Sequence, residues 1–295
     1  MSQVRLATRG SPLALAQAHL AATRLGAVGA DTELVIVDTE GDRRGDVALG
    51  ELAGRGVFTK EVQAAVLDGR ADVAVHSAKD LPARTPEGLE LAAVPERADP
   101  ADAIVGRPLR VLGPGARVAT GAPRRRALLL AERPDLDVVE LRGNIATRLS
   151  RVGIDGIDAV IVAVAALERL GLEHRIAERL NPVLFVPQVG QGAIALECLA
   201  GSSHATLVAR IDDAAAHGAL RCERAFLEEL GVGCDLPGGA HATLDGGTVT
   251  AHAVLMTEDG STMVRGTETG PDEAAVGRAL ARALRDALSR AIGQR

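Results

Sequence analysis

The sequence predicts an α/β protein that ends in a smaller α+β region. Over about the first 190 residues, short β-branched runs alternate with helical patterns, which indicates α/β units on largely parallel sheets. From about residue 212 the pattern changes to a long helix, a pair of alternating strands and a final helix. The chain has 295 residues, 47% of them hydrophobic, so it is long enough for two or three domains with separate cores.

The elements of the α/β part follow from these runs. Buried strands are predicted at 33–39, 71–77, 137–142 and 158–164, and helices at 11–27, 59–69, 123–134 and 144–152. The proline-flanked residues 94–103 are expected to cross from one lobe to another. Residues 184–198 are expected to cross back, because they end in another strand-like run.

The C-terminal part has a simpler pattern. A helix is predicted at 212–231, alternating strands at 248–257 and 261–269, and a last helix at 272–292. The EDG sequence between the two strands is typical of a hairpin turn. We therefore expect a small α+β region after residue 212.

Composition excludes several classes of protein. Cys198, Cys222 and Cys234 are too few for a disulfide framework and lack CxxC spacing, so no metal site is expected. The longest apolar run, 159–167, is too short to span a bilayer, and the N-terminus has no apolar signal region. A net charge of −6 and a pI of about 5.7 argue against a nucleic-acid partner. We expect a soluble protein of a reducing cytoplasm, with Cys198 and Cys222 in its core.

Three strand-to-helix junctions place arginine beside the start of a helix. The residues concerned are Arg9 with Ser11 and Pro12, Pro123 with Arg124 to Arg126, and Asn144 with Arg148. Helix N-termini attract anions, and the planar guanidinium matches a carboxylate bidentately. For a single arginine, a solvated surface charge is the better interpretation. Three repeats of one junction favour a ligand with several carboxylates or phosphates.

The stretch VHSAKDLP, residues 75–82, indicates a different chemistry. A buried strand ends at His76 and Ser77, and Lys79 and Asp80 follow before a proline. An aspartate among several cations keeps its charge, so Asp80 is a candidate for stabilising a developing cation or moving protons. The alternative is a surface ion pair in a turn.

These motifs together resemble one family, porphobilinogen deaminase, also called hydroxymethylbilane synthase. The matching strings include ATRGSPLALAQ, VHSAKDLP, RRRALLLAERPDL, LRGNIATRL, VGQGAIALEC and GVGCDLPGGAHA, in the family's order. They extend over nearly the whole chain. The resemblance implies two α/β lobes like those of type II periplasmic binding proteins, a central cleft between them, and a small C-terminal α+β domain.

The resemblance also implies domain limits and a mode of action. Domain 1 is expected at 1–95 and 191–211, domain 2 at 100–188 and domain 3 at 214–295. The implied protein is a cytoplasmic, monomeric transferase that joins four porphobilinogen molecules with loss of ammonia and releases hydroxymethylbilane by hydrolysis. The chain grows on a dipyrromethane cofactor, held covalently through a thioether to Cys234.

Site residues are carried over by motif match. Asp80 is expected to be catalytic, and the cofactor is expected to contact Lys79, Asp80, Thr120, Arg124 and Arg125. The residues expected to bind substrate carboxylates are Arg9, Ser11, Arg142, Arg148 and Arg169. A loop that contains Phe58 and Lys60 is expected to cover the cleft.

The chain departs from the family pattern at three places. Gly121 and Ala122 stand where the family often has hydroxyl residues, Arg126 where a different residue is expected, and Val232 where many members have glycine. No function is assigned to Arg126. Two other classes stay open on the residues alone: a two-lobed anion-binding module, such as a solute binder or regulator domain, and a cysteine-nucleophile hydrolase.

Overall fold

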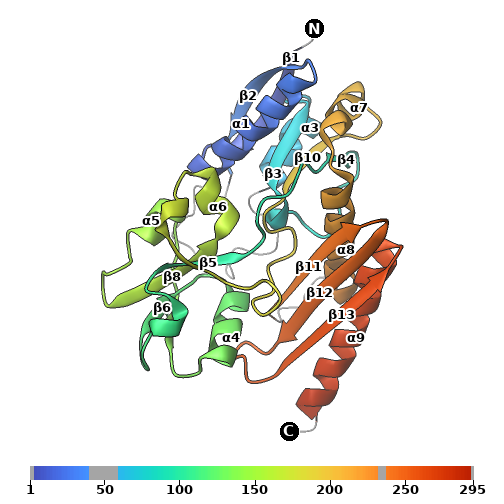
Figure 1. Cartoon of the computed structure of the whole chain (residues 1–295). Coiled ribbons are helices and arrows are strands. Elements are labelled where there is room, and N and C mark those ends of the chain that lie inside the picture. The colour runs from blue at the N-terminus through green and yellow to red at the C-terminus, as the bar shows by residue number, and fades with distance from the viewer. Residues whose placement is uncertain (1–2, 40–58, 232–236, 294–295) are drawn as a thin grey trace. The chain divides into compact units, whose positions relative to one another are not determined.

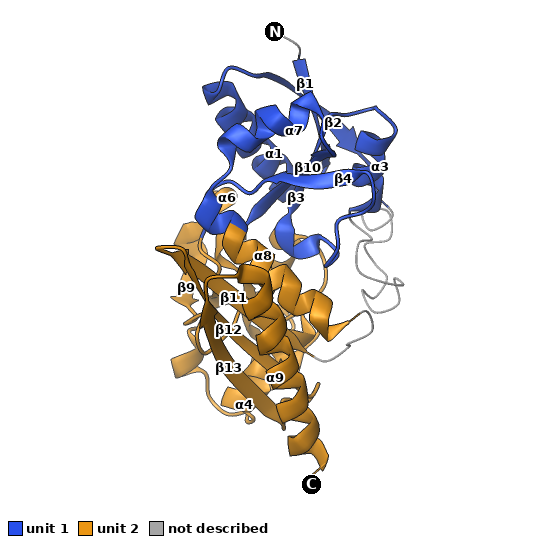
Figure 2. Cartoon of the chain, turned by 90° about the vertical axis from the view of Figure 1, so that its right-hand side faces the viewer, with its two compact units in different colours: residues 1–98, 192–217 blue, residues 99–191, 218–295 orange. Residues whose placement is uncertain are grey.

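The computed structural model describes residues 3–39, 59–231 and 237–293 (Figure 1). The chain forms two compact units (Figure 2). Unit 1 comprises residues 1–98 and 192–217, and unit 2 comprises residues 99–191 and 218–295. The predicted domain 1 falls in unit 1 except for Gln191, whereas the predicted domain 2 and most of domain 3 fall in unit 2. A separate third domain stays a prediction.

Unit 1 is built on a five-stranded sheet with the order β2-β1-β3-β10-β4. Its strands are β1 (Gln3–Arg9), β2 (Asp31–Val37), β3 (Val73–Ser77), β4 (Leu89–Ala93) and β10 (Ile194–Leu199). Its helices are α1 (Pro12–Ala27), α3 (Lys60–Leu67), α7 (Ser203–Val208) and the 3₁₀ turns η1 (Ala78–Asp80) and η4 (Ala209–Ile211). Apolar side chains at alternate strand positions, such as Leu6 and Leu196, pack with Leu25 of α1 to form the core.

Unit 2 contains a second five-stranded sheet, with the order β7-β6-β8-β5-β9. Its strands are β5 (Asp102–Gly106), β6 (Arg117–Ala119), β7 (Asp137–Val139), β8 (Ile157–Ala163) and β9 (Ile176–Arg179). Around it lie α4 (Pro123–Glu132), α5 (Ile145–Leu149), α6 (Val164–Arg169) and the 3₁₀ turns η2 (Leu109–Val111) and η3 (Glu173–Arg175).

The C-terminal part of unit 2 is an antiparallel sheet, β11-β12-β13, with a long helix against it (Figure 1). The strands are β11 (Gly238–Asp245), β12 (Thr248–Met256) and β13 (Met263–Gly270), and the helices are α8 (Ala214–Leu230) and α9 (Glu273–Gly293). Leu280 and Leu284 of α9 and Phe226 of α8 share one buried cluster with the sheet. Val254 and Met256 belong instead to the core around α4, so the two sheets of unit 2 share apolar packing.

The predicted α/β alternation is confirmed, but both five-stranded sheets are mixed rather than largely parallel. In unit 1, β1 pairs in parallel with β2 and β3, whereas β10 runs antiparallel to β3 and β4. In unit 2, β5 runs antiparallel to β8 and β9 in the same way. The antiparallel strands are those that follow a crossing segment, so they do not return through a helix as βαβ units do.

Four strands lie where none was predicted. β4 and β9 are short edge strands, β5 begins within the segment predicted only to cross between lobes, and β11 begins with Gly238 and Gly239, which lower the β-propensity of its sequence. Within the described residues, no helix is both long enough and apolar enough to cross a membrane.

Candidate functional site

In unit 1, two junctions predicted to bind a ligand meet at one edge of the sheet. β1 and β3 are parallel neighbours, with Leu6 opposite Val73 and Ala7 opposite Ala74. Arg9 ends β1, and Asp80 ends the η1 turn that follows β3 directly. Because the carboxyl ends of parallel strands share an edge, Arg9, Ser11 and Asp80 follow strands that end on the same side of the sheet.

Ser11 and Gln17 fix helix α1 at this edge. The Ser11 hydroxyl accepts a hydrogen bond from the Ala14 N–H at 3.4 Å, so it is the N-cap, and Pro12 opens the helix as predicted. The buried Gln17 amide donates to the Ser77 hydroxyl at 2.8 Å, and that hydroxyl donates back to the Gln17 Oε1 at 3.0 Å. Gln17 and Ser77 were not predicted as site residues. The two residues lie 60 positions apart in the sequence, so no local pattern indicates this pairing.

The remaining unit 1 candidates differ in exposure. Lys79 and Asp80 are half-buried, whereas Lys60 is exposed at the first position of α3. Phe58, the other predicted residue of the covering loop, lies outside the described residues. His76 is buried in β3, with its Nε2 3.2 Å from a carboxylate oxygen of Glu197, as suits a local structural role.

In unit 2, the second junction begins α4 without a side-chain cap. Ala122 has an extended N-cap conformation but no side chain that accepts a hydrogen bond, and Pro123 occupies the first helical position. Thr120 is buried, and its hydroxyl accepts from the Ala122 N–H at 3.3 Å. Gly121 allows a close approach, since a Cβ there would lie 2.5 Å from the Leu141 carbonyl oxygen. The first turn of α4 therefore begins directly with Arg124 and Arg125.

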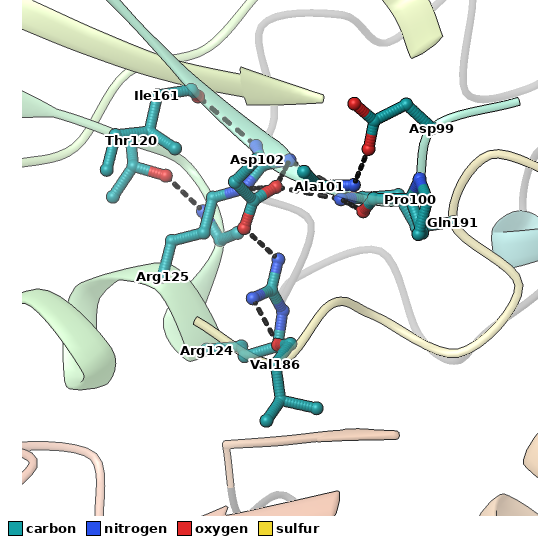
Figure 3. A network of polar contacts seen from close by, with 11 residues as sticks. Asp99, Pro100, Ala101, Asp102, Thr120, Arg124, Arg125, Ile161, Val186 and Gln191 are labelled. Carbon is teal, nitrogen blue, oxygen red and sulfur yellow. Dashed lines mark hydrogen bonds and ion pairs between the residues drawn. The ribbon is translucent and has the colours of Figure 1, made fainter. Parts of the chain in front are cut away.

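Both of these arginines are buried around Asp102 at the start of β5 (Figure 3). Arg124 Nη2 donates to Asp102 Oδ2 at 2.7 Å, and Arg125 donates to Oδ1 through Nε at 3.0 Å and Nη2 at 2.8 Å. Arg124 Nη1 also donates to the Val186 carbonyl at 2.7 Å, and Arg125 Nη1 to the Ile161 carbonyl at 3.2 Å. Asp102 was predicted only as part of a crossing segment. Its role is invisible in the sequence because its partners lie more than 20 residues away.

The charges of this network do not balance. Two guanidinium groups surround one carboxylate, which leaves one net positive charge in a buried environment. Burial alone raises the pKa of the Asp102 carboxyl, but both arginines together hold that pKa well below its usual range. Burial lowers the pKa of Arg124, and the charge of Arg125 lowers it further, while Asp102 opposes both effects. The ion pairs thus stabilise the folded chain above about pH 4, and this stabilisation is lost as the pH falls through the folded pKa.

Three further predicted arginines of unit 2 occupy different surroundings. Arg148 in α5 is half-buried and donates through Nε to the Gly143 carbonyl at 2.8 Å. Burial lowers its pKa, and the charge of Arg125 contributes to the same shift. Burial also lowers the pKa of Arg169, at the end of α6, to about 10. Arg142 forms an ion pair with Glu140 at 2.7 Å. The charges of Arg148 and Arg125 therefore repel each other, and Arg148 adds a third cation to Arg124 and Arg125.

Arg126 differs from its two neighbours. It is exposed, and its Nη1 donates to the Val138 carbonyl oxygen. Successive helix positions point in different directions, so three consecutive arginines cannot all face the same partner.

The chain on the C-terminal side of Cys234 runs beside Arg124. Cys234 and Val232 themselves lie outside the described residues. Gly239 packs against the Pro187 carbonyl, and a Cβ at this position would lie 3.0 Å from Arg124 Cδ. Only glycine permits so close an approach without displacing backbone.

Cys198 and Cys222 are core residues, as predicted. Both are fully buried, and burial raises the pKa of each thiol to about 12. A thiol with such a pKa has almost no nucleophilic thiolate at neutral pH.

Comparison with known proteins identifies the family. The family model described as porphobilinogen deaminase, dipyromethane cofactor binding domain, matches residues 4–206, and the model of its C-terminal domain matches residues 218–286. The chain belongs to the porphobilinogen deaminase family. Three similar family members, each called porphobilinogen deaminase, come from Syntrophotalea carbinolica, Roseiflexus castenholzii and Rubrobacter xylanophilus. They are 43%, 42% and 46% identical, over 92%, 99% and 95% of this chain and 88%, 98% and 92% of the relative.

The solved structures that match part of this chain include two binding proteins. A periplasmic substrate-binding protein of an ABC transporter from Coxiella burnetii has a TM-score of 0.43 and 14% identity, over 75% of this chain and 96% of that chain. The methionine binding protein MetQ has a TM-score of 0.43 and 12% identity, over 71% of this chain and 89% of that chain.

The side chains of unit 2 fit the dipyrromethane group of the family. The group is made of pyrroles with carboxylate side chains, and such a ligand needs several cations. The network of Arg124 and Arg125 with Asp102 carries a net positive charge, and Arg148 adds another cation. The donor set present therefore suits carboxylates.

Proposed function

We propose that this chain acts as a porphobilinogen deaminase. It would join four porphobilinogen molecules in turn onto a dipyrromethane primer, with loss of ammonia at each step, and release hydroxymethylbilane by hydrolysis. The observation that carries the proposal is the pair of buried guanidinium groups around a single carboxylate, in a chain of this family. We further propose that the enzyme is cytoplasmic and monomeric.

The arginines would bind carboxylates. Each porphobilinogen carries an acetate and a propionate, so both the primer and the growing chain present several negative charges. Arg124, Arg125 and Thr120 would hold the primer, and Arg142, Arg148 and Arg169 the substrate and the growing chain. From unit 1, Lys79 would contact the primer, Arg9 and Ser11 would contact the substrate, and Lys60 and Phe58 would belong to a covering loop. Arginine suits this function because its fork binds a carboxylate through two hydrogen bonds and stays charged when partly desolvated.

Asp80 would act on the reacting atoms. When bound, the dipyrromethane supplies the pyrrole end to which the substrate is joined. Loss of ammonia from porphobilinogen leaves a cationic azafulvene, and a fixed carboxylate lowers the energy of that cation. Asp80 is half-buried at the end of η1, directly after a strand of the sheet, so the fold holds its backbone firmly. Its carboxylate would also accept hydrogen bonds from pyrrole N–H groups and transfer protons as each carbon–carbon bond forms.

Cys234 would anchor the primer. Of the three cysteines, Cys198 and Cys222 are buried and carry raised thiol pKa values, which makes them poor nucleophiles and inaccessible ones. Cys234 lies in the glycine-rich stretch GVGCDLPGG, whose later glycine, Gly239, packs beside Arg124. A thioether at Cys234 would thus place the primer on the segment that leads to the arginine pair.

The test is intact-mass measurement of the purified full-length chain, followed by peptide mapping. We expect a covalent adduct on the Cys234 peptide, and none in Cys234→Ser, which should also lose activity. Cys198→Ser and Cys222→Ser serve as matched controls and should retain the adduct. A fully active chain of unmodified mass would overturn the proposal.

A further inference from the structure

Asp102 and Gln191 form hydrogen bonds with the arginine pair. Each of the two residues lies in one of the segments that were predicted to cross between lobes. Asp102 is fully buried, and both of its carboxylate oxygens accept from guanidinium groups, one oxygen for each arginine. Each guanidinium also donates to one backbone carbonyl, that of Val186 or of Ile161. The planes of the two forks are therefore fixed by partners within unit 2 before any ligand binds (Figure 3).

Gln191 completes this arrangement without adding charge. Its Nε2 donates to Asp102 Oδ1 at 2.9 Å and to the Pro100 carbonyl at 2.6 Å, and its Oε1 accepts from Arg125 Nη2 at 3.3 Å. The amide thus touches the carboxylate, one of the arginines and the segment that leads into β5. A glutamate here would lose both donated bonds and place a second carboxylate beside Asp102.

The arrangement leaves donors for a ligand. Arg124 has five N–H groups, and the partners described within unit 2 take two of them, at Asp102 and Val186. One carboxylate against two guanidinium groups also leaves a net positive charge in a site where water competes weakly. A ligand carboxylate would gain both the open donors and the unbalanced charge.

We propose that Asp102 and Gln191 are positioning residues, which orient Arg124 and Arg125 so that their remaining N–H groups hold a carboxylate of the dipyrromethane group. The inference rests on the proposed function, because it assigns these arginines to that group. Asp102 and Gln191 could instead act only by stabilising the fold, or Asp102 only through its charge. Positioning, stabilisation and charge make different predictions for substitutions that keep the charge.

The experiment uses the full-length chain and measures the fraction that carries the covalent adduct by intact mass. Asp102→Glu keeps the charge but moves it by one methylene, and Gln191→Leu removes the amide with no change of charge. At metal sites, loss of a partner that orients a ligating side chain lowers affinity or activity by roughly tenfold to a hundredfold, and by analogy we expect the loaded fraction to fall by about tenfold in both variants. The unfolding midpoint in urea is measured on the same samples.

Asp158→Asn is the matched control. Asp158 is a carboxylate of β8 in the same sheet that pairs with Arg107 at 3.1 Å and accepts from the Arg117 N–H at 3.0 Å, away from Arg124 and Arg125. This variant should lose stability but load normally, whereas a purely structural role predicts that loading follows stability in all variants.

The outcomes separate the two proposals. Normal loading of both Asp102→Glu and Gln191→Leu, with a loaded wild-type chain, overturns the positioning role and leaves the proposed function intact. Absence of the adduct from the wild-type chain overturns the proposed function itself. If Asp102→Glu does not fold, Gln191→Leu alone decides, because it removes no charge from the buried network.

Discussion

The five-stranded sheets of the two units have the same design but different electrostatics. Unit 1 has the strand order β2-β1-β3-β10-β4 and unit 2 the order β7-β6-β8-β5-β9, each with one inserted antiparallel strand that follows a crossing segment. Each inserted strand carries one buried carboxylate. Glu197 of β10 faces His76 and accepts from Gln63 at 2.7 Å, whereas Asp102 of β5 faces two arginines. The same topology thus supports a polar core contact in one unit and a positively charged network in the other.

The first junctions of the two sheets show a parallel difference. In unit 1 the chain passes from β1 through Gly10 and Ser11 to Pro12, and in unit 2 from β6 through Gly121 and Ala122 to Pro123. Ser11 caps its helix with its own hydroxyl, whereas Ala122 provides no side-chain cap. Unit 1 therefore satisfies a helix N–H with the side chain of its own N-cap, whereas in unit 2 the Thr120 hydroxyl accepts from the Ala122 N–H instead.

The largest expected effect tests whether the units divide the chemistry. Asp80→Asn in unit 1 keeps the shape of the side chain but removes its charge, so we expect kcat to fall by about a hundredfold or more. The adduct and the unfolding midpoint should be unchanged, since the proposed primer site consists mainly of unit 2 arginines. Asp68→Asn is the control, because Asp68 is an exposed carboxylate of unit 1 that pairs with Arg70 at 3.5 Å. Near-normal turnover of Asp80→Asn would remove Asp80 from the mechanism.

An intermediate effect is expected from one added methyl group at the two matching glycines. In Gly121→Ala the new Cβ would lie 2.5 Å from the Leu141 carbonyl oxygen, a backbone atom that cannot move alone. In Gly10→Ala it would lie 3.4 Å from Ile36 Cγ2, at the edge of ordinary contact. We expect Gly121→Ala to lower the free energy of unfolding by about 2 kcal/mol and Gly10→Ala by less than about 1 kcal/mol. Equal losses in urea unfolding would show that the two junctions are packed alike.

The smallest effect concerns the helix caps. Ser11→Ala should lower the free energy of unfolding by about 0.5–1 kcal/mol, because it leaves the Ala14 N–H without its acceptor. Ala122→Ser should raise it by a similar amount of about 0.5–1 kcal/mol, because the extended N-cap conformation is already present. Urea unfolding of each variant measures the two changes in the free energy of unfolding. If Ala122→Ser gives no gain, the N–H groups at the start of α4 already have other partners.

Several site features could be read from the sequence because they are local. Pro12 and Pro123 mark helix starts, Ser11 marks an N-cap, and Asp80 follows a buried apolar run, so each signal lies within a few residues. The short strands β4 and β9 gave weak signals, and Gly238 and Gly239 masked β11, since strand propensity depends on packing more than on the residue itself.

The alternation of strands and helices, the arginine-bearing junctions and the family could be inferred from the sequence, since all of these depend on neighbouring residues. The contacts of those arginines depend instead on how the chain folds. Asp102 lies 22 and 23 positions from its arginines and 89 from Gln191, and these groups meet only because β5 inserts beside β8. A buried charge is stable only where such distant partners converge, and no local pattern records that convergence.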